Sequence, residues 1–146
     1  MSASVTPVKP IGCTNFKLRQ LSRAVTRHYD GYVAGSGLKI TQYSLLAHVV
    51  KQGPIQPVDL ARRMNLEAST LTRNLQPLVA HGWIQMGPGA DGRSRLISAT
   101  EAGRTKHAEG HRAWKQAQLA LNARLGDARI ARLHELIDAC LVDLDK

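Results

Sequence analysis

The sequence is poor in cysteine and in long apolar runs, and each shortage excludes a class of protein. Two cysteines in 146 residues are too few for a disulfide scaffold and favour a reducing compartment. No run approaches the roughly 18 apolar residues of a membrane-spanning helix, and the amino-terminal stretch lacks the apolar core of a signal peptide. We therefore expect a cytoplasmic protein that has no membrane partner.

Acidic residues are also scarce. There are 11 Asp and Glu against 20 Lys and Arg, which gives a formal net charge of +9 at pH 7. This excess favours a polyanionic partner without identifying it. The sequence lacks a glycine-rich phosphate loop and a Ser/His/Asp arrangement that could support nucleophilic catalysis. We expect a protein that is not an enzyme and that carries no cofactor.

The stretch from Gln56 to His81 predicts two short helices joined by a tight turn. Pro57 suits the first position of a helix, and the apolar residues that follow recur at helical spacing. After a turn at residues 65–67, the leucines at 71, 75 and 78 form the inward stripe of a second helix. Hydroxyls, amides and arginine read base edges and bind phosphates, so its candidate DNA contacts are Ser69, Thr70, Thr72, Arg73, Asn74 and Gln76.

A β-hairpin is expected next. A short apolar strand spans residues 83–86, the Asp91-Gly92 pair marks the turn, and a second strand is expected from Arg93. Asp91 and Arg93 could form an ion pair that stiffens the tip, and Arg95 would share a strand face with Arg93. Arginines on a narrow β-hairpin can insert into a DNA minor groove, where the negative potential is concentrated. The whole pattern predicts a winged helix-turn-helix, although the two helices alone could be an ordinary amphipathic hairpin with a solvated polar face.

Two stretches carry a resemblance to a known family. The segment Asp-Gly-Arg-Ser-Arg-Leu-Ile-Ser-Ala-Thr-Glu-Ala-Gly (91–103) and the segment Leu-Thr-Arg-Asn-Leu-Gln-Pro-Leu-Val-Ala-His-Gly-Trp-Ile (71–84) closely resemble the MarR family of bacterial transcriptional regulators. The resemblance extends from about Cys13 to Leu144. It implies a mainly α (α+β) winged helix-turn-helix with about six helices and a two- or three-stranded wing, assembled as an intertwined homodimer. It also implies a repressor of a pseudo-palindromic operator in double-stranded DNA.

The expected organisation is a flexible arm at residues 1–12 and a single domain at 13–146. Within it, the winged helix covers about 40–99 and the dimerisation helices about 13–34 and 101–145. Thr41, Thr100 and Asp127 are the expected helix caps. The last helix carries an apolar stripe from Ile130 to Leu144 that must be buried. The resemblance implies a partner subunit there, and an intrachain core is the alternative.

The resemblance further implies a small-molecule effector. In the family, phenolic or other aromatic carboxylates bind between the dimerisation helices and the DNA-binding lobe, and release of DNA follows. Our candidates for the wall of this site are Phe16, Arg19, Tyr43 and His48.

Other interpretations stay open. Cys13 lies where the first helix should begin, and a helix N-terminus can lower a thiol pKa. Some MarR regulators sense organic hydroperoxides through such a cysteine, but here Lys17 replaces the tyrosine expected one turn later. His107 and His111 have a zinc-compatible spacing, yet we expect solvated histidines and no metal. Two further rivals are a non-specific nucleoid-type DNA-binding protein and a winged helix that binds protein only.

Overall fold

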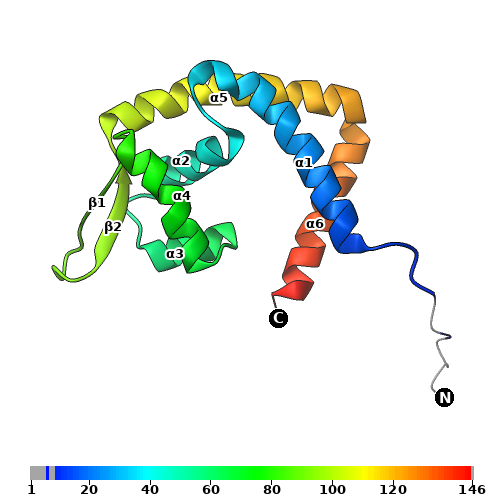
Figure 1. Ribbon diagram of the computed structural model, residues 1–146, viewed down its shortest axis with the longest axis horizontal. Helices are drawn as coiled ribbons and strands as arrows, with labels where there is room; N and C mark the ends of the chain where they lie inside the picture. Colours follow the sequence, from blue (N-terminus) through cyan, green and yellow to red (C-terminus); the bar gives the residue numbers. More distant parts are fainter. Residues whose placement is uncertain (1–5, 7–8, 146) are drawn as a thin grey trace.

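The helices of the computed structural model form an arch (Figure 1), and residues 6 and 9–145 are described. The long α5 spans its top. One leg is the winged lobe, made of α2, α3, α4, β1 and β2, and the other leg is made of α1 and α6. Most of the predicted arm, residues 1–12, lies outside the described residues. The element bounds are α1 Thr14–Val33, α2 Ile40–Gln52, α3 Pro57–Met64, α4 Ala68–Ala80, β1 Ile84–Pro88, β2 Arg95–Ala99, α5 Glu101–Leu125 and α6 Asp127–Leu144.

The hydrophobic core lies in the winged lobe. The inward stripe of α4 packs with apolar residues of α2, α3 and the sheet, and Leu46, Leu60, Leu71, Leu78 and Ile97 are all at most 1% exposed. Burial of each such side chain stabilises the fold by roughly 1.5–3 kcal/mol, as an upper estimate. Because α4 is anchored along this stripe, its opposite, polar face is directed outward.

The wing is a two-stranded antiparallel sheet. Its register runs from Ile84 opposite Ala99 to Pro88 opposite Arg95. The possible third strand of the wing is present only as a single bridge between Ile55 and Ile97. It does not extend further because Pro54 and Pro57, on either side of Ile55, have no N–H to donate.

Two of the three predicted caps are wrong. Thr100 does cap α5, where its Oγ1 accepts from the Gly103 N–H at 3.0 Å. In contrast, α2 begins at Ile40, before Thr41, because Asp30 of α1 accepts the Ile40 N–H at 2.7 Å. Similarly, α6 begins at Asp127 itself, and Gly126 with its positive φ of 89° occupies the cap position.

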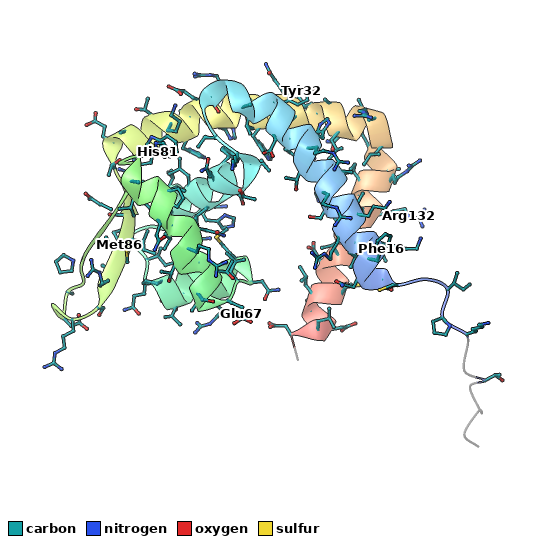
Figure 2. All side chains as sticks on the ribbon, viewed as in Figure 1. Phe16, Tyr32, Glu67, His81, Met86 and Arg132 are labelled. Atoms are coloured by element: carbon teal, nitrogen blue, oxygen red, sulfur yellow. The ribbon has the colours of Figure 1, made fainter. Side chains whose placement is uncertain are left out.

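The leg of α1 and α6 exposes apolar side chains. Figure 2 shows Phe16 and Tyr32 on α1, which are 59% and 41% exposed. On α6 only Ile130 is buried, whereas Ile137 and Leu141 are 41% and 45% exposed. An intrachain core therefore does not cover the stripe of the last helix. None of the helices in the described part of the chain is long and apolar enough to cross a membrane.

Candidate nucleic-acid interface

The outward face of α4 carries most of the predicted helix contacts. The side chains of Ser69, Arg73, Asn74 and Gln76 are exposed, and Thr70 is half-buried. Thr72 is exposed too, but its hydroxyl donates to the Ala68 carbonyl at 3.0 Å. Thr72 is therefore the least available of the six for a contact with a base.

The tip of the wing is held by Asp91. Its Oδ1 accepts the N–H groups of Arg93 at 3.0 Å and Ser94 at 2.8 Å, and its Oδ2 accepts the Ser94 hydroxyl at 2.6 Å. These bonds, led by that of the Ser94 hydroxyl, lower the pKa of the Asp91 carboxyl from 3.8 to about 2. The carboxylate is ionised at neutral pH and braces the turn.

The predicted Asp91–Arg93 ion pair is wrong. Among the described residues the ion pairs are Arg62–Asp59 and Lys106–Glu109. Asp91 binds the backbone instead, which takes the N–H groups of residues 93 and 94 out of the ladder and delays β2 until Arg95. Arg93 therefore lies in the turn, on no strand face, and the side chains of Arg93 and Arg95 are both exposed.

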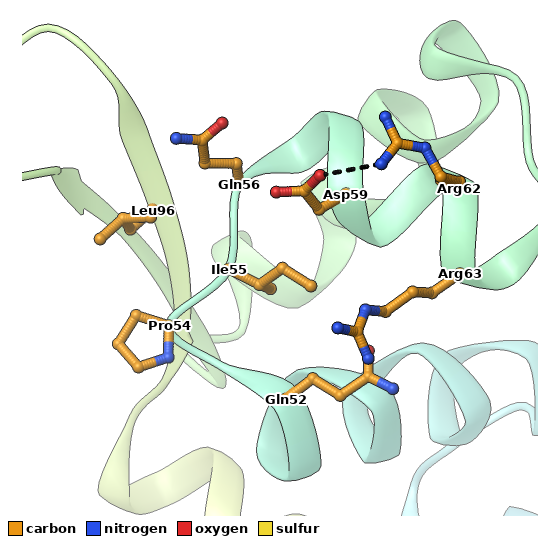
Figure 3. Close-up of a pocket in the computed structure, with 8 residues that line it drawn as sticks. All are labelled: Gln52, Pro54, Ile55, Gln56, Asp59, Arg62, Arg63 and Leu96. Atoms are coloured by element: carbon orange, nitrogen blue, oxygen red, sulfur yellow. Dashed lines mark hydrogen bonds and ion pairs between the residues drawn. The ribbon is translucent and has the colours of Figure 1, made fainter.

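A second basic surface was missed by the sequence reasoning. Between the wing root and α3 lies a cavity of about 530 Å³ (Figure 3), and Arg62 and Arg63 reach it from the last turn of α3. Arg62 is paired with Asp59 at 3.4 Å. The adjacent arginines were a usable signal, but cations are also expected at a helix C-terminus, where they interact with the dipole.

Two of the four predicted effector residues line one cavity. Its volume is about 350 Å³ and it lies between α1, α2 and α5. Tyr43 and His48 lie in its wall, but Phe16 and Arg19, in the first turns of α1, do not. The remaining lining residues are Tyr29, Ile40, Ser44, Ala47 and Trp114. Burial raises the pKa values of Tyr29 and Tyr43, so both hydroxyls are neutral at physiological pH.

The cysteines and histidines also have defined positions. Cys13 is the N-cap residue of α1, and Cys140 lies on α6; both thiols are exposed. Redox sensing by Cys13 stays a prediction. The expectation of solvated histidines is wrong for His107, whose ring is half-buried and stacked on Tyr43. No group of three metal-ligating side chains gathers in the part of the chain that the structure describes.

These elements, two helices joined by a tight turn and followed by a hairpin, define a winged helix-turn-helix protein. A family model described as the MarR family matches residues 36–94, which contain α2, α3, α4, β1 and the turn of the wing. The chain belongs to the MarR family, and the first two relatives below are transcriptional regulators by name.

Three of these relatives show the extent of the similarity. An uncharacterised HTH-type transcriptional regulator of Bacillus subtilis, YwoH, is 28% identical over 93 residues, covering 64% of this chain and 68% of YwoH. The transcriptional regulator MosR of M. tuberculosis, solved in complex with DNA, has a TM-score of 0.72 and 30% identity, covering 88% of this chain and 98% of MosR. A mutant MarR of E. coli with operator DNA has a TM-score of 0.77 at 22% identity, over 87% and 92% of the two chains, and supports the fold alone.

Proposed function

We propose that this protein is a cytoplasmic, sequence-specific regulator that binds double-stranded DNA as a homodimer. The observation that carries the proposal is the exposed polar face of α4 beside a wing whose arginine-bearing tip is braced by Asp91. The M. tuberculosis relative, at 30% identity, was solved in complex with DNA and supports the same partner here.

The two elements have different tasks in this proposal. Helix α4 enters the major groove, where Arg73, Asn74 and Gln76 can make hydrogen bonds with base edges. Arg93 and Arg95 of the wing bind phosphates or enter the minor groove, where the negative potential is concentrated. Sequence preference comes mainly from α4, and the wing contributes mainly affinity.

A second copy of the chain covers the exposed apolar faces of α1 and α6. The side chains of Ile137 and Leu141 are large, apolar and exposed to water in the single chain. Exposed apolar surfaces of this kind mark contacts with a partner. A two-fold dimer places two α4 helices about 34 Å apart, one turn of DNA, and so requires a pseudo-palindromic site.

An aromatic carboxylate is the proposed effector, and the protein is proposed to be a repressor that this ligand releases. The cavity between α1, α2 and α5 offers neutral phenols, the His48 ring and the Trp114 indole to such a ligand. A ligand that binds better to a dimer with differently spaced α4 helices lowers DNA affinity by that difference and no more.

Selection of bound duplexes from a random DNA library tests the DNA-binding proposal. We expect enrichment of one pseudo-palindrome with half-sites centred about 10 base pairs apart. Retention of random duplexes without enrichment would identify a non-specific nucleoid-type protein. No retention at all would favour a protein-binding winged helix.

A further inference from the structure

A group of ring contacts joins α5 to α2, and the function proposed above leaves its two histidines, His107 and His111, without a role. The His107 ring stacks on Tyr43 with centroids 5.6 Å apart and an interplanar angle of 7°. The Tyr43 hydroxyl lies 3.1 Å from Nδ1 of His111, which also stacks on Trp114. Gly110 permits this approach, because a Cβ there would lie only 2.8 Å from Cδ2 of Tyr43. Any change at these rings therefore acts directly on the α2–α5 contact.

No carboxylate contacts either imidazole among the described residues. Glu109 accepts from Lys106 at 3.0 Å, and Asp30 accepts the Ile40 N–H at 2.7 Å. A proton added to the pair would therefore remain uncompensated by an anion. The charged and titratable groups nearest to the two rings along the packed elements include His28, Tyr29 and Asp30 of α1, Lys39 at the N-cap of α2, Tyr43 and His48 of α2, and Lys106, Glu109, Arg112 and Lys115 of α5.

We propose that His107 and His111 form an acid-sensitive latch, which holds the winged lobe against α5 at neutral pH and loosens when both rings are protonated. The ring centroids are 5.9 Å apart, so two imidazolium charges repel each other. The face of Tyr43 attracts a single cation, which makes the second proton the disruptive one.

The direction of the pH effect follows from His107. Burial, and secondarily the charge of His111, lower the pKa of His107 below its ordinary 6.5. A histidine whose folded pKa is depressed resists protonation in the folded state. Its contribution to stability is complete above about pH 6.5 and is lost as the pH falls below that value.

Opening the latch would reorient α4. Helix α2 shares the lobe core with α4, since Leu46 and Leu71 belong to the same buried cluster, so the two move together. The lobe has a second attachment to α5, where Gly103 lies against Trp83. With the latch open, the lobe can turn about its remaining contacts with the start of α5, where Arg104 also donates to the Ala99 carbonyl at 3.2 Å, and the spacing of two α4 helices in a dimer would change. This consequence for DNA rests on the proposed function.

Hydrogen exchange of the whole 146-residue chain tests the latch without DNA. Amide protection in α2, corrected for intrinsic exchange rates, should fall by about tenfold between about pH 7.5 and pH 5.5. In the double variant His107→Gln, His111→Asn, which keeps polar side chains but removes both titrations, the fall should stay within about twofold. The variant His134→Gln, which removes an exposed histidine of α6, should respond like the parent.

An equal fall in the parent and the double variant, or no fall in the parent, would overturn the latch. Ring titration of the parent by NMR covers the case in which the double variant does not fold. His107 should titrate below the ordinary histidine value of 6.5, and its titration at or above that value would also overturn the proposal. DNA affinity at both pH values is measured separately. A protein that binds no DNA at either pH but shows the exchange response would refute the proposed function and leave the latch standing.

Discussion

Single residues determine how closely the winged lobe approaches α5. Gly103 is the tightest of these positions, because a Cβ added there would lie 1.9 Å from the carbonyl oxygen of Trp83. That carbonyl also accepts the Thr100 N–H at 3.0 Å, at the start of α5. Because Gly103 has no side chain, the first turn of α5 can pack directly against the backbone of Trp83 at the root of the wing.

Replacement of Gly103 by alanine should destabilise the protein. Backbone rather than a flexible side chain opposes the new methyl group, so overpacking of about 1–3 kcal/mol is expected. Gly31→Ala in α1 is the matched control: nothing lies within 4 Å of its Cβ position. It should instead raise stability by about 0.5–1 kcal/mol through helix propensity. Urea unfolding of both variants checks the prediction, and equal midpoints would contradict it.

Asp91 should matter for DNA affinity and not for the stability of the core. Asp91→Ala removes the bonds to Arg93 and Ser94, so the wing tip must be ordered on binding, which should weaken binding about two- to tenfold. Asp91→Asn keeps an acceptor for the backbone N–H groups and should lose less. Thermal unfolding and equilibrium DNA binding separate the two effects. A large loss of thermal stability in Asp91→Ala would show that the residue supports more than the wing.

At the scale of elements, helix and wing were predictable because their signals are local. The leucine stripe at 71, 75 and 78 and the Asp91-Gly92 turn each lie within a few residues, and α4 and the hairpin form there. The residues at which helices begin were less predictable. The start of α2 depends on Asp30, ten residues earlier and on another helix, and local propensity does not contain that contact.

The candidate site shows the same limit. The exposed face of α4 could be predicted from the helical spacing of its buried leucines alone. The wall of the cavity between α1, α2 and α5 could not, because Tyr29, Tyr43 and Trp114 come from three helices that only the tertiary fold brings together. Tyr43 and His48 lie about one and a half turns apart on α2 and share that wall, whereas Phe16 and Arg19 lie near the start of α1 and are not among its lining residues; an effector role for any of the four stays a prediction.

Variants of the wing should change overall DNA affinity, whereas variants of α4 should change sequence preference. Arg95→Ala should weaken binding to most duplexes and reduce the salt dependence by about one unit per lost phosphate contact. Arg73→Ala should change sequence preference, by about 1–3 kcal/mol if a bidentate base contact is lost. Both side chains are exposed in the free protein, so folding should be unaffected. The test measures each variant on a panel of operator variants over a range of salt. Indistinguishable profiles would refute the division of tasks.

At the scale of the whole molecule, the leg made of α1 and α6 is the surface that the proposed dimer buries. Ile137→Glu with Leu141→Glu places charges on the exposed apolar face of α6 and should convert a dimer into monomers. Val58→Glu, at a 58% exposed position of α3 in the winged lobe, is the matched control and should remain dimeric. Sedimentation equilibrium gives the mass of each. An unchanged dimer in the α6 variant would mean that the chains associate through another surface.

In the proposed complex, two copies of the chain read one pseudo-palindromic site through α4 and the wing. The most direct measurement is equilibrium binding to the selected duplex and to the same duplex with its half-sites moved apart by about five base pairs, half a helical turn. Because the second α4 would then face the wrong side of the DNA, we predict at least about a hundredfold weaker binding, approaching the non-specific level. Equal affinity for the two duplexes would contradict the account.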